Sequence, residues 1–348
     1  MNCILKKIKF IAGTHVMMFF CLFLLIPSIA SAHKIKHIVT FGDSLSDHHG
    51  LKTYVSTARE AMTNGDVWIE YLARELNATL DNNAFIGAMT SKHINDDIQA
   101  LSDTETIPQL GLIAQIDRYI DEAHTFEPSE TLFTIWIGAN NLIRFGMGGF
   151  PGMQPDEMIT NAMTDVSNAV TKLLNIGATN YVVMTLPDIG KSPFYNWRSE
   201  EEIAGATQLS ASYNAGFMHT INQLLMNKPG IAVYEFDLFQ IMDEIIQKQI
   251  FPNITGSYMK LDEGFYATDE TNEGPAEDYF FWDSVHPTTK AHEYFAEKVV
   301  QRILYDGFYT QQELDQAVLA ERTKWDLKND NRIGLEEAIQ ALKTCSGM

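Results

Sequence analysis

A strand pattern passes into a polar turn within the segment Ile38-Val39-Thr40-Phe41-Gly42-Asp43-Ser44-Leu45-Ser46-Asp47. Its first four residues are apolar or β-branched, as in a buried strand, and the residues from Gly42 onward favour a turn. Short apolar runs of the same kind, each followed by polar, Gly or Pro residues, recur at 132–137, 181–186 and 231–236. We therefore predict four buried strands, with residues 38–41 forming the central one.

Longer segments with helical periodicity separate these runs. Apolar residues recur three and four positions apart, the spacing of one helix face, at 67–76, 108–123, 155–176 and 202–226. Strands that alternate with helices are typical of a parallel sheet with helices on both faces. We predict an α/β fold of three layers, an α/β/α sandwich. Residues 251–280 are rich in Gly, Asn, Asp and Glu without a clear period, and we expect a long loop over or beside the site.

The composition sets limits on function. The chain has 348 residues, of which 45% are hydrophobic and 20% are charged, so it can bury a full core and is not a disordered segment. Lys and Arg number 25 against 45 Asp and Glu, a formal net charge of −20. A field of that sign repels the phosphates of nucleic acids. We expect no nucleic-acid partner.

The first 32 residues have the layout of a secretory signal peptide. Three lysines precede an apolar run at 16–26, and the small residues Ala30-Ser31-Ala32 end the segment. We expect cleavage after Ala32 and a secreted protein, extracellular or periplasmic, with no transmembrane segment left; an uncleaved anchor is the alternative. The mature chain would retain a single cysteine, Cys345, so it can form no internal disulfide. We expect a monomer.

Ser44 is a candidate nucleophile, because ligands bind beyond the carboxyl ends of the strands in such sheets. Its hydroxyl needs an adjacent base, and the base needs a third group that holds its tautomer. His286 has Asp283 three residues before it, a spacing that lets one turn hold both side chains and leaves one ring nitrogen free to face Ser44. Taken alone, a serine in this place is usually a turn residue or a helix cap.

An acyl-transfer enzyme also needs donors aimed at the oxyanion that develops on the attacked carbonyl. Asn140 follows the predicted strand 132–137 closely, so its amide can reach the same crevice. Gly87 can offer a backbone N–H from a loop that glycine lets approach closely. Asp43 adjoins the nucleophile, but we expect it to brace the loop through hydrogen bonds to backbone.

These residues lie in four blocks that resemble, in order and separation, the signature blocks of the GDSL or SGNH hydrolase family. The resemblance implies that Ser44 is the nucleophile and the first oxyanion donor, that Gly87 and Asn140 are the other donors, and that Asp283 and His286 complete a catalytic triad. It also implies the family's three-layer sandwich with a parallel central sheet.

The resemblance covers residues from about 36 to 305 and departs from the family pattern in one place. The third block usually reads G-x-N-D, whereas residue 141 is Asn, which puts a supporting hydrogen bond in doubt. The context from Phe281 to Thr288 resembles secreted bacterial phospholipases A, lysophospholipases and glycerophospholipid:cholesterol acyltransferases. We therefore expect an esterase that acts on lipid or lysolipid esters. The alternatives are an esterase of acetylated sugars or small esters, and a non-catalytic secreted calcium-binding module.

The C-terminal end carries a separate pattern. Asp326, Asp330 and Glu337 stand at positions 1, 5 and 12 of a loop that resembles a single EF-hand. Lys328 occupies a ligand position and Asn331 replaces the turn glycine, so the loop either binds calcium weakly or is only a helical hairpin. We thus divide the chain into a signal peptide (1–32), a hydrolase domain (33–308) and a helical tail (309–348). Catalysis is expected to need no cofactor.

Two histidines after the nucleophile turn, His48 and His49, suggest a metal site. The sequence offers no adjoining cluster of acids or cysteines to complete it, and we expect these side chains to line the acyl entrance instead. His292 follows His286 by six residues and is expected to face away from it on a helix, in a packing or surface role.

Overall fold

In the computed structural model, a parallel five-stranded sheet has the order β2-β1-β3-β4-β5. The strands are β1 (His37–Gly42), β2 (Thr79–Asn82), β3 (Thr131–Trp136), β4 (Asn180–Met184) and β5 (Ala232–Phe236). Every residue of β3 and β4 is buried, as expected where helices cover both faces of a parallel sheet. The central position belongs to β3, so our expectation for residues 38–41 is wrong: β4 and β5 both lie on the far side of β3, and only β2 lies outside β1.

The structure describes residues 35–48, 50–54, 62–100, 107–226, 228–262 and 267–305. Those up to Val300 belong to one compact unit. The expected signal segment, the tail with its EF-hand-like loop, and Cys345 lie outside the described residues. Among the helices that are described, none has the length and apolar character needed to cross a membrane.

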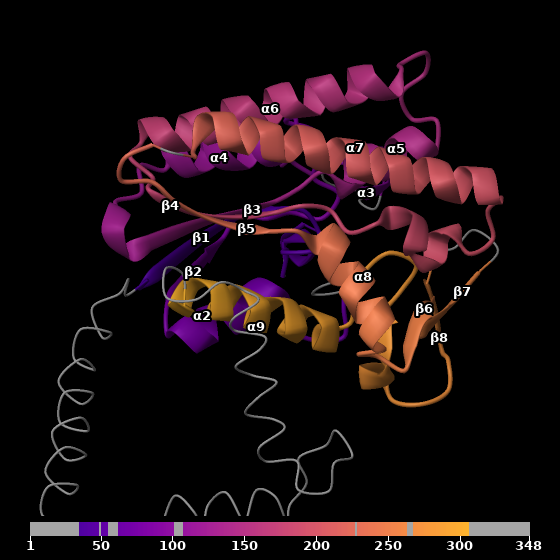
Figure 1. The fold of residues 1–348 in the computed structure, drawn as a ribbon. Coiled ribbons are helices and arrows are strands. Elements are labelled where there is room, and N and C mark those ends of the chain that lie inside the picture. The colour runs from indigo at the N-terminus through magenta and orange to yellow at the C-terminus, as the bar shows by residue number, and fades with distance from the viewer. Residues whose placement is uncertain are drawn as a thin grey trace, which may run out of the picture. The chain divides into compact units, whose positions relative to one another are not determined.

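Helices cover both faces of the sheet (Figure 1) and confirm the predicted three-layer sandwich. One layer contains α4 (Leu112–Asp121), α6 (Pro155–Asn175) and α7 (Glu200–Leu224), and the other contains α2 (Trp68–Leu76) and α9 (Thr289–Tyr305). The other helices are α3 (Asp96–Gln99), α5 (Ala139–Gly146) and α8 (Leu238–Lys248). The Glu202 carboxylate accepts from Ser199 N–H, and the Ser199 hydroxyl accepts from Glu202 N–H, which fixes the start of α7.

The segment at 251–280 is not the long loop that we expected. It contains β6 (Asn253–Ser257), β7 (Met259–Leu261), β8 (Ala267–Thr271) and β9 (Tyr279–Phe281), where β6 pairs with β9 and β7 with β8. These strands have three to five residues each and contain register irregularities, so no alternation is long enough to show in the sequence. The strand β9 ends directly before the segment that carries Asp283 and His286.

An aromatic cluster ties the sheet to the α2 and α9 layer below the site. The rings of Trp68 and Trp136 meet edge to face at 6.1 Å, and Phe295 of α9 meets Trp136 at 5.8 Å. The indole N–H of Trp68 donates to the Ser46 hydroxyl at 2.9 Å, so the buried polar end of the ring has a partner. The core therefore extends to the turn that holds Ser44.

Candidate active site

The turn after β1 is fixed from several sides. A Cβ atom on Gly42 would lie 2.5 Å from the Trp136 carbonyl oxygen, so only glycine lets β1 and β3 approach here. The buried Gln115 amide of α4 accepts from Gly42 N–H at 3.0 Å and donates to Gly42 C=O at 2.8 Å. The N–H groups of Ser46 and Asp47 both donate to the Asp43 carbonyl at 3.0 Å. The backbone around Ser44 is therefore held rigidly.

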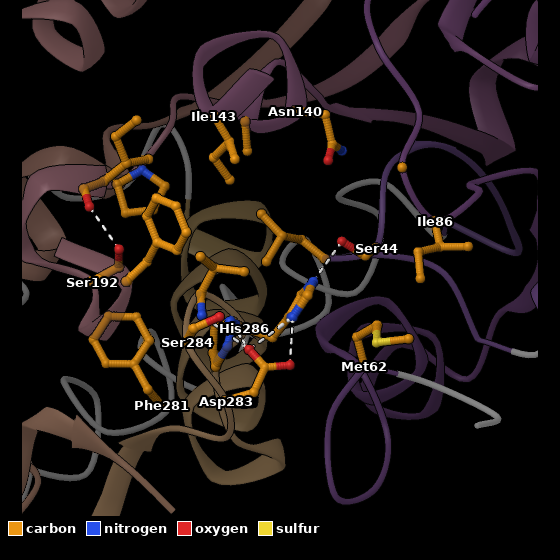
Figure 2. Close-up of a pocket in the computed structure, with 18 of the residues that line it drawn as sticks. Ser44, Met62, Ile86, Asn140, Ile143, Ser192, Phe281, Asp283, Ser284 and His286 are labelled. Atoms are coloured by element: carbon orange, nitrogen blue, oxygen red, sulfur yellow. Dashed lines mark hydrogen bonds and ion pairs between the residues drawn. The ribbon is translucent and has the colours of Figure 1, made fainter. Parts of the chain in front are cut away.

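Three side chains from two distant segments form a hydrogen-bonded chain (Figure 2). His286 Nε2 lies 2.8 Å from Ser44 Oγ, and His286 Nδ1 lies 2.8 Å from Asp283 Oδ2. Asp283 Oδ1 accepts from the backbone N–H groups of Val285 and His286, which fixes the carboxylate relative to the ring. The structure thus brings Ser44, His286 and Asp283 into the geometry that serine activation requires.

Charges around His286 favour its protonated form. Burial lowers the pKa of His286, but the charge and hydrogen bond of Asp283, with a further contribution from Asp43, raise it above its ordinary value. Burial raises the pKa of Asp283, but the His286 ring and two backbone N–H groups outweigh this effect and hold that pKa below its ordinary value. An imidazolium formed when His286 accepts a proton is therefore stabilised while Asp283 stays ionised.

Asp43 is fully buried and close enough to His286 for their charges to interact. Its Oδ1 accepts from Leu45 N–H at 3.0 Å, whereas its Oδ2 has no hydrogen-bond partner among the described residues. Burial raises the pKa of Asp43 to about 7, against the opposing effects of that hydrogen bond and of His286. Asp43 thus braces the turn and places a titratable carboxyl beside His286.

We predict that Asp43→Asn moves the acid limb of the pH profile of ester hydrolysis to lower pH. His286 must be neutral to accept the serine proton, and the wild-type limb should have a midpoint above the ordinary histidine value of 6.5. Removing the Asp43 charge removes one of the groups that raise the pKa of His286. The measurement is kcat/KM from pH 5 to pH 9, with the exposed Asp121→Asn as control. An unshifted or raised midpoint would contradict this role.

A second loop brings a backbone donor to the turn. Gly87 has φ +73°, in the left-handed region, and a Cβ there would lie 2.6 Å from the Ile98 side chain. Asp47 Oδ2 accepts from Ile86 N–H at 2.8 Å, which ties this loop to the nucleophile turn. The backbone N–H groups of Ser44 and Gly87 donate to no other group within the described part of the chain, and both residues line one cavity.

Asn140, at the first turn of α5, faces the same cavity (Figure 2). Its Nδ2 donates to Ala88 C=O at 3.0 Å, and its Oδ1 accepts from Asn95 Nδ2 at 2.8 Å. These contacts fix which way the amide points and leave its second N–H for another acceptor. The structure thus brings Ser44, Gly87 and Asn140, the three expected oxyanion donors, to one place.

The cavity has a volume of about 590 Å³, within the ordinary range for small-molecule sites. Its wall is mainly apolar, and it is formed in part by Met62, Ile86, Ile143, Phe194, Phe281 and Val285. Polar residues line it around Ser44 and also on the opposite side, where Ser192 lies (Figure 2), and Asp188 lines it as well. Phe280 and Phe281 contribute to the wall, whereas Trp282 stacks on Tyr258 at 5.4 Å.

The side chains that hold these loops were not predicted from the sequence. Gln115 holds Gly42 through two hydrogen bonds, Asn95 donates to Asn140, and Asp47 accepts from Ile86 N–H. Only Asp47 had a visible signal, since it lies in the same block as Ser44. The remaining signal was Gln115 itself, a polar residue on the apolar face of a predicted helix.

His48 has acidic neighbours that the sequence analysis did not expect. His48, Asp66 and Glu70 each place a ligand-type atom within 4.8 Å of the others. Each already has a partner: His48 pairs with Glu70, Glu70 accepts from Val67 N–H, and Asp66 pairs with Arg74 at 2.6 Å. The N-cap of α2 is Val67. His49 lies outside the described residues.

His292 is buried on α9. Its ring meets Phe295 edge to face at 6.2 Å, and burial lowers the pKa of His292 to about 3. It is a neutral packing residue, one of the two roles expected for it.

The family model described as GDSL-like Lipase/Acylhydrolase matches residues 38–299. The chain belongs to this family. Membership in the GDSL family supports an ester-hydrolysing enzyme.

The relatives of this GDSL family member include two named bacterial proteins. A thermolabile hemolysin of Vibrio parahaemolyticus is 26% identical over 294 residues, covering 77% of this chain and 64% of its own length. A phosphatidylcholine-sterol acyltransferase of Aeromonas hydrophila is 26% identical over 212 residues, covering 58% of each protein. The chain therefore matches less than two thirds of the length of either relative.

Solved structures are similar at lower identity. An alpha/beta hydrolase enzyme from the metagenome of Lake Arreo is 14% identical, with a TM-score of 0.44, over 77% of this chain and 94% of that one. An acetylxylan esterase from Geobacillus stearothermophilus is 16% identical, with a TM-score of 0.41, over 79% of this chain and 97% of that one.

Proposed function

We propose that this protein is a secreted serine esterase that hydrolyses acyl esters of phospholipids or lysophospholipids through an acyl-enzyme. The observation that carries the proposal is the chain of hydrogen bonds from Asp283 through His286 to Ser44 Oγ, at the edge of an apolar cavity. The signal-like segment at 1–32 supports export.

The chemistry follows from the contacts. Ser44 Oγ attacks the ester carbonyl as His286 Nε2 accepts its proton, and the charge on the carbonyl oxygen is stabilised by the Ser44 and Gly87 N–H groups and the Asn140 amide. Collapse breaks the bond to the alcohol, which takes the proton from His286 as it leaves. Water then attacks the acyl-Ser44 ester, with His286 again as base, and releases the acid. An alcohol in place of water would give acyl transfer.

The substrate class is inferred from the cavity. Its apolar wall suits a hydrocarbon chain, and each methylene that leaves water contributes about 0.8 kcal/mol. The similarity to a phosphatidylcholine-sterol acyltransferase supports a lipid ester, since that name states a lipid acyl donor. We keep weak calcium binding by Asp326, Asp330 and Glu337 as a separate proposal; it takes no part in these steps.

A substrate panel tests the proposal. With p-nitrophenyl esters of increasing chain length, we expect kcat/KM to rise by up to about fourfold per methylene until the cavity is full, and long-chain phosphatidylcholine or lysophosphatidylcholine to be hydrolysed. Ser44→Ala gives the background rate. Acetate esters as the best substrates would instead indicate an esterase of acetylated sugars or small esters. If no ester is hydrolysed, the protein is non-catalytic and the proposal is wrong.

A further inference from the structure

Asn141, the residue directly after the proposed oxyanion donor Asn140, is turned away from the substrate cavity. Its side chain is buried and makes two hydrogen bonds with one residue of the Gly87 loop. Asn141 Oδ1 accepts from Thr90 N–H at 3.0 Å, and Asn141 Nδ2 donates to Thr90 Oγ1 at 3.1 Å. The amide thus uses both of its ends on Thr90, which is fully buried.

The Thr90 hydroxyl extends the contact to a third element. Because Thr90 Oγ1 accepts from Asn141, its single proton is available for Asp165 of α6, and it donates to Asp165 Oδ2 at 3.0 Å. Burial raises the pKa of Asp165, against the opposing effects of Thr90 and His93. The hydrogen bonds therefore run in one direction, from a neutral amide through a hydroxyl to a carboxyl group.

This chain of contacts lies directly behind the proposed oxyanion donors. Thr90 is three residues after Gly87, and the residue between them that faces Asn140 is Ala88, whose carbonyl accepts from Asn140 Nδ2 at 3.0 Å. The Gly87 loop is therefore attached to α5 at two points, through Asn140 and through Asn141. A shift of Thr90 would move both the Gly87 N–H and the carbonyl that orients Asn140.

We propose that Asn141, Thr90 and Asp165 are positioning residues that hold the oxyanion donors in place. Residue 141 must then be neutral, because the single hydroxyl proton of Thr90 is already donated to the carboxyl group of Asp165. The proposal rests on the esterase function proposed above. It also gives a reason for Asn at a position where the family pattern usually has Asp.

An aspartate at position 141 would conflict with Asp165. Both carboxylates would lie within hydrogen-bond distance of the same hydroxyl, which has one proton to donate. Like charges this close disfavour each other, and one of the two acceptors would lose its donor. The conflict can be relieved by moving the loop, and a displacement of about 1 Å at a catalytic group can lower the rate about 100-fold.

The test is a charge-swap cycle measured on p-nitrophenyl acetate, which needs no particular acyl chain. We expect Asn141→Asp to lower kcat about 10- to 100-fold with KM changed less than about twofold, since the donors act mainly on the transition state. Asp165→Asn should cost about threefold or less, because the new amide oxygen still accepts from Thr90. In the double variant, Thr90 donates to the carboxylate introduced at position 141 and accepts from the amide introduced at position 165. Its kcat should recover to within about threefold of wild type.

Controls separate this role from misfolding and from failure of the esterase function itself. The exposed Asn175→Asp makes the same chemical change at the far end of α6 and should leave kcat unchanged. Rates are expressed per active site, counted by the burst from a serine-directed organophosphate, and melting temperatures are compared. If Ser44→Ala retains wild-type activity, the proposed function fails, whatever the cycle shows.

Two results would overturn the proposal. One is Asn141→Asp with wild-type kcat per active site, and the other is a loss in Asn141→Asp that Asp165→Asn does not repair. If Asn141→Asp does not fold, Thr90→Val tests the proposal instead. It removes the hydroxyl and keeps the backbone N–H that donates to Asn141. A fall in kcat of about tenfold at constant KM supports the network, and an unchanged kcat rejects it.

Discussion

Ser44→Ala is expected to lower kcat for ester hydrolysis by about 10⁴- to 10⁶-fold, and His286→Ala by a similar factor. The serine oxygen forms the new bond, and the ring 2.8 Å away accepts its proton, so neither can act without the other. The double variant should be no slower than the single variants, since the losses of groups that act together do not add. Steady-state kinetics of the three variants on one ester gives all three rates.

Ser46→Ala is the matched control. It removes a buried hydroxyl from the same turn, two residues away, where the oxygen accepts from Trp68 and does not face His286. We expect a lower melting temperature, because the indole N–H loses its partner, and nearly wild-type kcat. Ser44→Ala with more than about a tenth of the wild-type activity would reject the assignment of the nucleophile.

Asn140→Ala is expected to lower kcat about 10²- to 10³-fold with little change in KM. The amide would bind the developing oxyanion more tightly than the ground-state carbonyl, so its loss should appear in kcat. The substitution also removes the contacts with Ala88 and Asn95. The measurement is kcat and KM on the same ester, per active site.

Asn141→Ala is the neighbouring comparison for this prediction. Asn141 acts through Thr90 and touches no reacting atom, so its loss should cost clearly less than the loss of Asn140. Equal KM effects in both variants would point to substrate binding instead. If Asn141→Ala were the more damaging, the oxyanion donor would have been assigned one residue too early.

The fold could be predicted where the sequence pattern is local. The strands β1, β3, β4 and β5 are apolar runs, and α2, α6 and α7 are long amphipathic segments, so each shows its own period. Strand order is not local: the short polar run Thr79–Asn82 forms β2 at the sheet edge, and β4 and β5 both lie on the far side of β3, which makes β3 central and not β1. The strands β6 to β9 are too short for any period to appear.

The residues of the site were predictable to the extent that each lies in a block next to a strand end or a turn. The residues that hold them come from elsewhere in the chain. Gln115 reaches Gly42 across 73 positions, and Asp165 reaches Thr90 across 75. Such contacts depend on how helices pack on the sheet, and no spacing along the chain records that packing.

The most direct test of the account is to trap the nucleophile. Diethyl p-nitrophenyl phosphate should react once per protein, with Ser44 Oγ displacing p-nitrophenolate and retaining the diethylphosphoryl group, and peptide mass spectrometry should place that group on Ser44. His286→Ala should slow the labelling greatly, because the hydroxyl then has no base. Labelling of another residue, or full-rate labelling of Ser44 without His286, would contradict the account.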